Sequence, residues 1–376
     1  MSESPAPAAA QAQQAALRAW LLLGQRAGDR AQVEAVGAAL AALGWSCEPK
    51  RIVANGLFRI PNLLLGASLV SMDRQASAAL TPPWPELVIA AGRRSVPAAL
   101  WIRRQTQGRA RLVHIGRPWA PLRWFDLVVT TAQYGLPERP NVLRNALPVS
   151  PLDRARLDEA AARWAPRLAT LPRPWIAVLV GGEARPYRLD AAAAGRLGRE
   201  ASQMARAAGG SLLVSTSPRT PADAADALQA NLEAPHHLHR WAPGADNPYP
   251  AFLALADRLV VTGDSASMLA EACATGRPVR IFPLPERPDL RLRGVRAFQR
   301  LAKQSPLVAA WYSRLVDLGL VTSVRDMSAF HEELYRHGLA APMTEGSATP
   351  ASAPQDGLAR TIARIQTLFE AEETRR

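Results

Sequence analysis

Short apolar runs alternate with longer amphipathic segments in the first part of this chain. The apolar runs are Trp20–Leu23, Leu87–Ala91, Arg111–Ile115 and Phe125–Thr130. Between the first two, Val33, Val36, Leu40 and Leu43 recur at helical spacing, and Gly44 follows, as expected at the end of a helix. Short apolar strands that alternate with helices predict βαβ units and a parallel sheet.

The same alternation begins again after the proline-containing break at residues 171–174. Strands are predicted at Trp175–Val180, Ser211–Ser215, Leu259–Thr262 and Val279–Phe282. Helices are predicted at residues 152–168, 190–208, 222–231 and 265–275, and a last amphipathic helix at Leu358–Phe369. The fold class is therefore α/β, with two Rossmann-like parallel-sheet lobes facing a cleft. In such sheets, ligands bind beyond the carboxyl ends of the strands.

The predicted domain organisation follows from these two series. Residues 1–16, rich in Ala, Pro and Gln, form a disordered leader. The first lobe covers 17–150, a linker helix 151–171, and the second lobe 172–340. Residues 341–356 are a linker rich in Ser, Thr, Ala and Pro, and 357–376 contain the C-terminal helix.

The charge balance favours anionic partners. The chain of 376 residues has 45 Lys and Arg against 32 Asp and Glu, for a net charge of +13. Only Lys50 and Lys303 are lysines, so arginine supplies the excess, partly through a general enrichment in Arg, Ala and Pro. Phosphates and an anionic membrane surface fit this charge. Scattered arginines and only 6% aromatic residues argue against nucleic acid.

Two cysteines, Cys47 and Cys273, exclude a disulfide scaffold and a zinc site built on cysteine pairs. His236, His237 and His239 cluster without a cysteine nearby and are interpreted as surface residues, so no metal ligands are predicted. No apolar run approaches the ~20 residues of a membrane span, and no signal-peptide core is present. The expected location is cytoplasmic.

The segment Val260–Glu271 carries the strongest local pattern. A strand runs into Gly263-Asp264-Ser265, and a helix follows with Asp264 or Ser265 as its N-cap. The free N–H groups of a helix start make an anion site, and Glu271, about two turns along, can accept hydrogen bonds from ribose hydroxyls. An ordinary capped helix with a surface glutamate fits the same spacing.

Two further strand ends in the second half are candidates for phosphate contact. In Gly181-Gly182-Glu183, the paired glycines would let a phosphate approach the backbone. A tight turn without a ligand fits the same residues. In Ser217-Pro218-Arg219-Thr220-Pro221, Thr220 can cap the next helix while Arg219 either binds phosphate or lies in solvent.

In the first half, the loop from Gly24 to Gln32 matches neither the dinucleotide pattern nor a Walker loop. Asp29 is its one carboxylate, which makes it a candidate general base; an N-cap role fits equally. In Gly92-Arg93-Arg94, the arginine side chains either contact an anionic acceptor or lie in solvent at the edge of the sheet.

Three connected segments resemble the ELM (elongated mitochondria) fission-factor family. They are residues 247–257, 260–268 and 271–279, with further matches at Gly28 and Gln32, Gly92-Arg93-Arg94, Gly181-Gly182, and Ser217 with Arg219-Thr220-Pro221. Gly24-Gln25 and Pro218 differ from the usual family residues. The family resembles GT-B glycosyltransferases, and Glu271, Gly276 and Pro278 are similar to the nucleotide-binding helix of MurG-like transferases.

The resemblance implies a sugar-nucleotide-dependent, metal-independent glycosyltransferase that acts on a lipid-linked or cell-surface glycan. Its first lobe would hold the acceptor, its second lobe the donor nucleotide sugar, and its C-terminal helix would pack back on the first lobe. It would need no cofactor, and it would lie peripherally on the inner leaflet of the cell membrane. The alternative is a non-catalytic GT-B-like scaffold that recruits fission partners, as the plant member recruits a dynamin-related protein.

The expected site residues fall into three groups. Those expected to bind the nucleotide sugar are Gly181, Gly182, Ser217, Arg219, Thr220, Asp264, Ser265, Ser267, Met268 and Glu271. Those of the acceptor or phosphate loop are Gly28, Gln32, Arg93 and Arg94, and Asp29 is the expected catalytic base.

Overall fold

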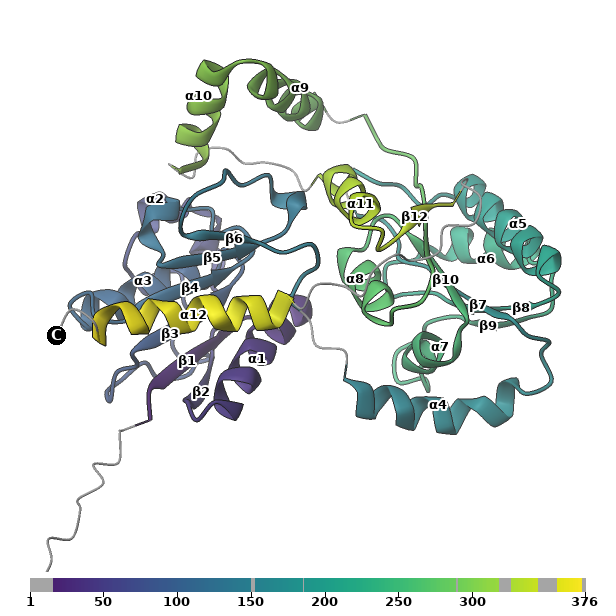
Figure 1. Ribbon diagram of the computed structural model, residues 1–376, viewed down its shortest axis with the longest axis horizontal. Helices are drawn as coiled ribbons and strands as arrows, with labels where there is room; N and C mark the ends of the chain where they lie inside the picture. The colour runs from purple at the N-terminus through teal and green to yellow at the C-terminus, as the bar shows by residue number, and fades with distance from the viewer. Residues whose placement is uncertain are drawn as a thin grey trace, which may run out of the picture.

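Two α/β lobes lie side by side in the computed structural model (Figure 1). The structure describes residues 16–149, 153–184, 186–288, 290–317, 326–343 and 357–373. Each lobe has a six-stranded sheet in which every strand pair is parallel. The predicted fold class is confirmed.

The first sheet has buried, mostly apolar strands at its centre and more polar strands at its edges. Its order is β2 (Ser46–Arg51), β1 (Arg18–Leu23), β3 (Leu87–Ala91), β4 (Arg111–Ile115), β5 (Leu127–Thr130) and β6 (Val142–Arg144). Helices α1 (Ala27–Ala42) and α12 (Gly357–Glu373) cover one face, and α3 (Val96–Gln105) covers the other. Short turns η1 (Gly56–Arg59), α2 (Asn62–Leu65), η2 (Leu122–Trp124) and η3 (Ala132–Tyr134) connect them.

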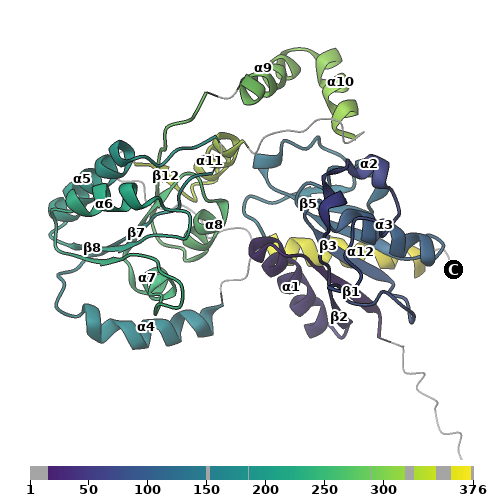
Figure 2. The ribbon, with the colours of Figure 1, turned by 180° about the vertical axis from the view of Figure 1, so that it is seen from behind.

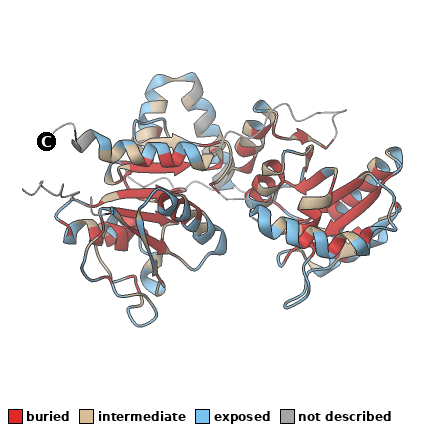
Figure 3. Ribbon diagram, turned by 60° about the horizontal axis from the view of Figure 1, so that its bottom comes forward, coloured by how far each residue is buried: buried red, intermediate tan, exposed pale blue. Residues whose placement is uncertain are grey.

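The second sheet repeats this architecture. Its order is β12 (Ala341–Pro342), β11 (Val279–Phe282), β10 (Arg258–Thr262), β7 (Trp175–Leu179), β8 (Ser211–Ser215) and β9 (His236–His239). Its helices are α4 (Arg154–Leu168), α5 (Ala191–Ala207), α6 (Ala222–Ala230), α7 (Tyr249–Leu255), α8 (Ala266–Ala274) and α11 (Met327–Arg336). Figure 3 shows both sheets as buried layers under helices whose outer faces are exposed.

Two segments cross from the second lobe to the first. Helices α9 (Leu290–Gln304) and α10 (Pro306–Asp317) form a hairpin whose Tyr312 and Val316 are buried in the first-lobe core. Helix α12 returns to the opposite face of the first sheet, where Ile365 is fully buried. No helix among the described segments is long and apolar enough to cross a membrane.

The structure differs from the predicted organisation at both ends of the second lobe. Helix α4, expected as a linker, buries Ala160, Trp164 and Leu168 in the second-lobe core. Residues 341–342, expected in a linker, form edge strand β12 and pair with β11. Residues 1–15, most of the expected leader, and 344–356, most of the expected second linker, lie outside the described residues.

Candidate functional site

A cleft of about 710 Å³ opens between the two lobes at the carboxyl ends of their strands. Its first-lobe wall includes the loops after β1, β3 and β5, and its second-lobe wall includes Glu183, Arg219, the turn from Asp264 to Ser267, and Glu271. Small-molecule sites are typically about 300–1,000 Å³. The cleft is therefore large enough for a ligand that both lobes contact.

Helix α8 starts at the cleft wall. Ser265 is its N-cap, and the Ser265 hydroxyl accepts a 3.5 Å hydrogen bond from the Met268 N–H. Ser265 and Ser267 line the cleft, whereas Met268 packs against the second-lobe core. The first N–H groups of any helix have no intrahelical acceptor and favour an anion. The turn and helix start thus form an anion-binding geometry in the cleft.

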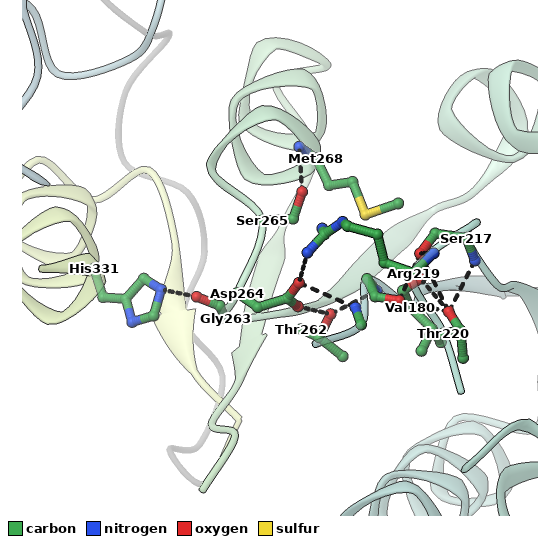
Figure 4. Close-up of polar contacts among 12 residues, drawn as sticks. Val180, Ser217, Arg219, Thr220, Thr262, Gly263, Asp264, Ser265, Met268 and His331 are labelled. Atoms are coloured by element: carbon green, nitrogen blue, oxygen red, sulfur yellow. Dashed lines mark hydrogen bonds and ion pairs between the residues drawn. The ribbon is translucent and has the colours of Figure 1, made fainter. Parts of the chain in front are cut away.

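Asp264 ties this turn to two other strand ends (Figure 4). Its buried carboxylate accepts hydrogen bonds from the Thr262 hydroxyl at 2.7 Å and from the Gly182 N–H at 3.0 Å. The same carboxylate forms a 2.9 Å ion pair with the Arg219 guanidinium. A buried carboxylate with three partners fixes the geometry of the loops that carry them.

Gly181 and Gly182 are needed for close packing at this junction. A Cβ atom on Gly182 would overlap the backbone carbonyl of Arg219, and one on Gly181 would overlap the Asp264 carboxylate. Both glycines lie behind the cleft wall, next to Glu183, which lines it. Because these two glycines have no side chains, the ends of the neighbouring strands can pack closely.

Ser217 and Thr220 bond to the same backbone carbonyl. The Ser217 hydroxyl donates to Gly181 O at 2.6 Å, and the Thr220 hydroxyl donates to it at 2.5 Å. The predicted capping role of Thr220 is wrong, because Pro221 is the N-cap of α6 and no side chain caps that helix. Both hydroxyls instead hold the loop that presents Arg219 to the cleft.

Glu271 lines the cleft and is held by a tyrosine. The Tyr249 hydroxyl, from α7, donates a 2.5 Å hydrogen bond to Glu271 Oε2. Burial raises the pKa of the Glu271 carboxyl above its ordinary value, while the hydrogen bond from Tyr249 acts against that shift. The hydrogen bond anchors one carboxylate oxygen of Glu271, a residue that lines the cleft with Ser265 and Ser267.

Asp29 faces the cleft from the first turn of α1. The N-cap of α1 is Arg26, without a side-chain hydrogen bond, so the N-cap alternative for Asp29 is wrong. The Asp29 carboxylate lies against Gly92, where φ is +72° and a Cβ atom would overlap it. Gln32 donates to Gly28 O at 3.2 Å, and both residues line the cleft.

Four arginines line this first-lobe wall, Arg26, Arg93, Arg94 and Arg117, and the first three interact electrostatically. Burial lowers the pKa of Arg93 most, and the charges of Arg94 and Arg26 lower it further. Arg93 donates to the backbone carbonyl of Phe58 at 2.7 Å, and Arg94 stacks 4.1 Å from the Phe58 ring. Like charges brought this close favour an anionic ligand.

Residues that the sequence analysis did not single out also shape the cleft. Thr131 Oγ1, Gln133 Oε1 and Asn145 Oδ1 are buried oxygens with no hydrogen-bond partner among the described residues, and their side chains line the cleft. His331, from α11, contacts Gly263 O at 2.8 Å through Nε2 (Figure 4). Thr131 and Gln133 follow the predicted strand Phe125–Thr130, so the strand-end rule could have found them, whereas no local pattern pointed to Asn145 or His331.

No group of three or more His, Cys, Asp or Glu side chains that could hold a metal ion occurs in the described part of the chain. The three clustered histidines form the edge strand β9. His237 packs against Trp164 and Phe252, with ring centroids 5.6 and 5.9 Å away.

A model of the family described as "Mitochondrial fission ELM1" matches residues 27–315. The chain belongs to the mitochondrial fission ELM1 family. The "Mitochondrial fission protein ELM1" of Arabidopsis thaliana is 30% identical over 219 residues, which are 52% of this chain and 51% of the relative. The match thus spans about half of that ELM1 protein. An uncharacterized protein of Rickettsia prowazekii is 22% identical over 299 residues, 71% of this chain and 83% of the relative.

The ELM1-family chain also has a solved structural neighbour. A Listeria monocytogenes protein named as a UDP-N-acetylglucosamine 2-epimerase aligns with a TM-score of 0.51 and 12% sequence identity. The alignment covers 95% of this chain and 98% of the neighbour. The likeness establishes that this member of the ELM1 family has a GT-B-like fold.

Proposed function

We propose that this ELM1-family chain is a sugar-nucleotide-dependent glycosyltransferase that works without a metal ion. Its acceptor is a lipid-linked or cell-surface glycan, and it acts peripherally on the inner leaflet of the cell membrane. The observation that carries the proposal is the pairing of Glu271, anchored by Tyr249, with the start of α8 on one cleft wall. The activity on a UDP-sugar in the Listeria protein's name supports the same ligand class.

Each part of a nucleotide sugar has a candidate partner. Glu271 accepts hydrogen bonds from the ribose hydroxyls, and Ser265, Ser267 and the α8 N–H groups contact the diphosphate. Arg219, fixed by Asp264, adds positive charge beside them. Gly181, Gly182, Ser217 and Thr220 support that loop from behind, and Met268 supports the helix.

The first-lobe wall supplies the remaining functions. Arg93 and Arg94, with Gly28 and Gln32 in the first turns of α1, face the acceptor and the leaving diphosphate. Fixed positive charge there replaces a divalent ion, because preorganised charges stabilise a developing anion. Asp29 is the proposed general base for the acceptor hydroxyl.

The test of this proposal is a titration calorimetry panel of UDP, GDP, ADP and CMP. We expect one nucleotide to bind, and Glu271→Ala to weaken its binding by about 1.5–3 kcal/mol, the range for a hydrogen bond to a charged group. Glu138→Ala is the matched control, because its side chain is 92% exposed and lies outside the cleft. Equal affinities of wild type and Glu271→Ala, with both folded, would remove Glu271 from the site.

The second candidate function is a non-catalytic scaffold that recruits membrane-remodelling partners. The family description and the name of the Arabidopsis relative favour it. Turnover of a radiolabelled nucleotide sugar with membrane extract as acceptor separates the two functions. Transfer of the labelled sugar that persists with a metal chelator present supports the metal-independent glycosyltransferase. Conversion of the free nucleotide sugar without transfer supports epimerisation instead. Nucleotide binding without turnover supports the scaffold.

A further inference from the structure

The α9–α10 hairpin carries large apolar side chains on its outer surface. Leu290, Leu301, Leu307 and Trp311 are 81%, 52%, 77% and 66% exposed. On α10, Leu307, Trp311 and the exposed Arg314 are spaced by four and three residues, so they share one face of the helix. Exposed leucine and tryptophan side chains grouped in this way mark an interaction surface.

The opposite face of the hairpin is already packed. Tyr312 and Val316 are buried against the first lobe, Phe298 packs beside Tyr312 with ring centroids 5.7 Å apart, and the Tyr312 hydroxyl donates to Gly135 O at 3.3 Å. Arg296 fixes α9 to the second lobe through Glu286 and Asp326. The outer face is therefore held in one orientation and projects from the molecule (Figures 1 and 2).

The hairpin is strongly basic, and its one acidic position is Asp317, the last residue of α10. Between residues 290 and 316 the sequence contains Arg291, Arg293, Arg296, Arg300, Lys303 and Arg314, and no Asp or Glu. Arg296 is neutralised by its two acidic partners, whereas Arg293, Arg300 and Arg314 are exposed. Exposed arginine therefore lies among exposed leucine and tryptophan.

A second apolar turn lies at the same edge of the first lobe. Four exposed apolar side chains lie on η1, on α2 and between them: Leu57, Ile60, Leu63 and Leu64, with Leu64 at 74%. Asn62 holds this turn by donating 2.9 Å hydrogen bonds to the carbonyls of Arg93 and Pro118. Both ribbon views place α2 and α10 at one edge of this lobe, the upper edge of Figure 1.

We propose that the outer face of α9–α10, extended by the 57–64 turn, docks onto an anionic lipid bilayer. A helix face that presents leucine and tryptophan between arginines buries its apolar side chains at the acyl boundary and pairs its charges with lipid phosphates. The proposal names the surface for the peripheral membrane attachment included in the proposed function, and it does not require catalysis.

The experiment is flotation of the full chain with phosphatidylcholine vesicles, with and without phosphatidylglycerol. We expect binding only to the anionic vesicles, weakened by salt. The double variant Leu307→Asp/Trp311→Asp should lower the vesicle partition coefficient at least tenfold. Arg300→Glu should lower it on the order of thirtyfold, because two units of charge change at the surface.

Two matched controls keep the proposal falsifiable. Leu43→Asp changes an exposed leucine, 52% accessible, at the C-cap of α1, and Arg258→Glu makes the same charge change as Arg300→Glu at the start of β10. Both should bind vesicles as the wild type does, and all variants should keep the wild-type circular dichroism spectrum and nucleotide affinity.

Three results would overturn the proposal. The first is no binding of the wild type to anionic vesicles, and the second is equal binding of the double variant. The third is a sedimentation experiment in which the double variant dissociates a dimer while vesicle binding is unchanged, which would assign the face to a second copy of this chain. Nucleotide binding is measured separately, so a failure here removes this membrane-docking surface and leaves the proposed nucleotide-sugar site and its chemistry standing.

Discussion

At the scale of single residues, the proposed chemistry depends on two carboxylates on opposite walls of the cleft, Asp29 and Glu271. If transfer inverts the sugar configuration, Asp29 takes the proton from the acceptor hydroxyl. Asp29→Asn should then lower kcat about 10²–10⁴-fold, the usual contribution of a general base, and leave donor affinity unchanged. Glu34→Gln, on the exposed side of the same helix, is the control. Wild-type turnover by Asp29→Asn, or a product of retained configuration, would contradict the assignment.

Tyr249 gives a second prediction at this scale, based on pH. Ribose hydroxyls donate to the ionised Glu271, so nucleotide affinity should rise with pH as Glu271 ionises and level off above its raised pKa. The hydrogen bond from Tyr249 lowers that pKa, so Tyr249→Phe should move the acid limb of the affinity profile to higher pH. The plateau affinity should fall by about 1 kcal/mol as the carboxylate loses its anchor.

Calorimetric titrations across a pH series measure both effects. Tyr312→Phe is the matched control, because its hydroxyl bonds to Gly135 on the first lobe. If nucleotide affinity falls by the same factor at every pH and the acid limb of its profile does not move, then Tyr249 does not set the pKa of Glu271. Its role would then be to stabilise the fold only.

At the scale of elements, the junction between the strand ends of β7 and β8 should be intolerant of added volume. In Gly182→Ala, the new methyl group meets the rigid Arg219 backbone carbonyl, so the loops must move apart. We expect a loss of about 1–3 kcal/mol in the free energy of unfolding, as for other overpacked sites. Gly28→Ala has open space around the new methyl and lies in α1, so it should be neutral or stabilising. Urea denaturation compares the two, and equal stability would refute the packing argument.

The sequence predicted the central strands of both sheets and missed the edges. Central strands such as β3 and β7 are buried on both faces, so they appear as continuous apolar runs. Edge strands β2, β6, β9 and β12 are short or partly exposed, and a run such as Ser46–Arg51 carries no apolar signal. Helices α9, α10 and α11 were also missed, although Met327, Phe330 and Leu334 have helical spacing.

The sequence predicted only those parts of the candidate site whose residues lie close together in the chain. The turn and helix from Gly263 to Glu271 lie in one segment, and of the two N-caps that the pattern allowed, Asp264 and Ser265, the structure has Ser265. The partners of its groups lie elsewhere: Tyr249 is 22 residues from Glu271, and the carbonyls that Arg93 holds are 33 to 35 residues away. Which carbonyl or carboxylate an arginine reaches is decided by tertiary packing, and spacing along the chain does not determine it.

At the scale of the whole molecule, the first lobe is completed by the last helix of the chain. Ile365 of α12 is fully buried with Val33 and Val36 of α1, and Phe369 meets Trp45 edge-on with ring centroids 5.0 Å apart. Without α12, one face of the first sheet loses part of its cover. Folding of this lobe therefore depends on residues more than 200 positions beyond its last strand, as the bond between Asn145 and Gly357 at a separation of 212 illustrates.

Because α12 covers one face of the first sheet, a substitution in its buried face should destabilise the first lobe only. Ile365→Ala should lower the free energy of unfolding by about 2–5 kcal/mol, the range for truncating a buried isoleucine to alanine. Thr367→Ala, at an exposed position on the same helix, should change it little, since alanine favours the helix. Limited proteolysis should cut Ile365→Ala first within residues 16–149, while nucleotide affinity under native conditions stays at the wild-type value because Glu271 and α8 belong to the second lobe. Early cleavage in the second lobe, or a parallel loss of nucleotide affinity, would mean that α12 supports the whole cleft and that the lobes do not fold as separate units.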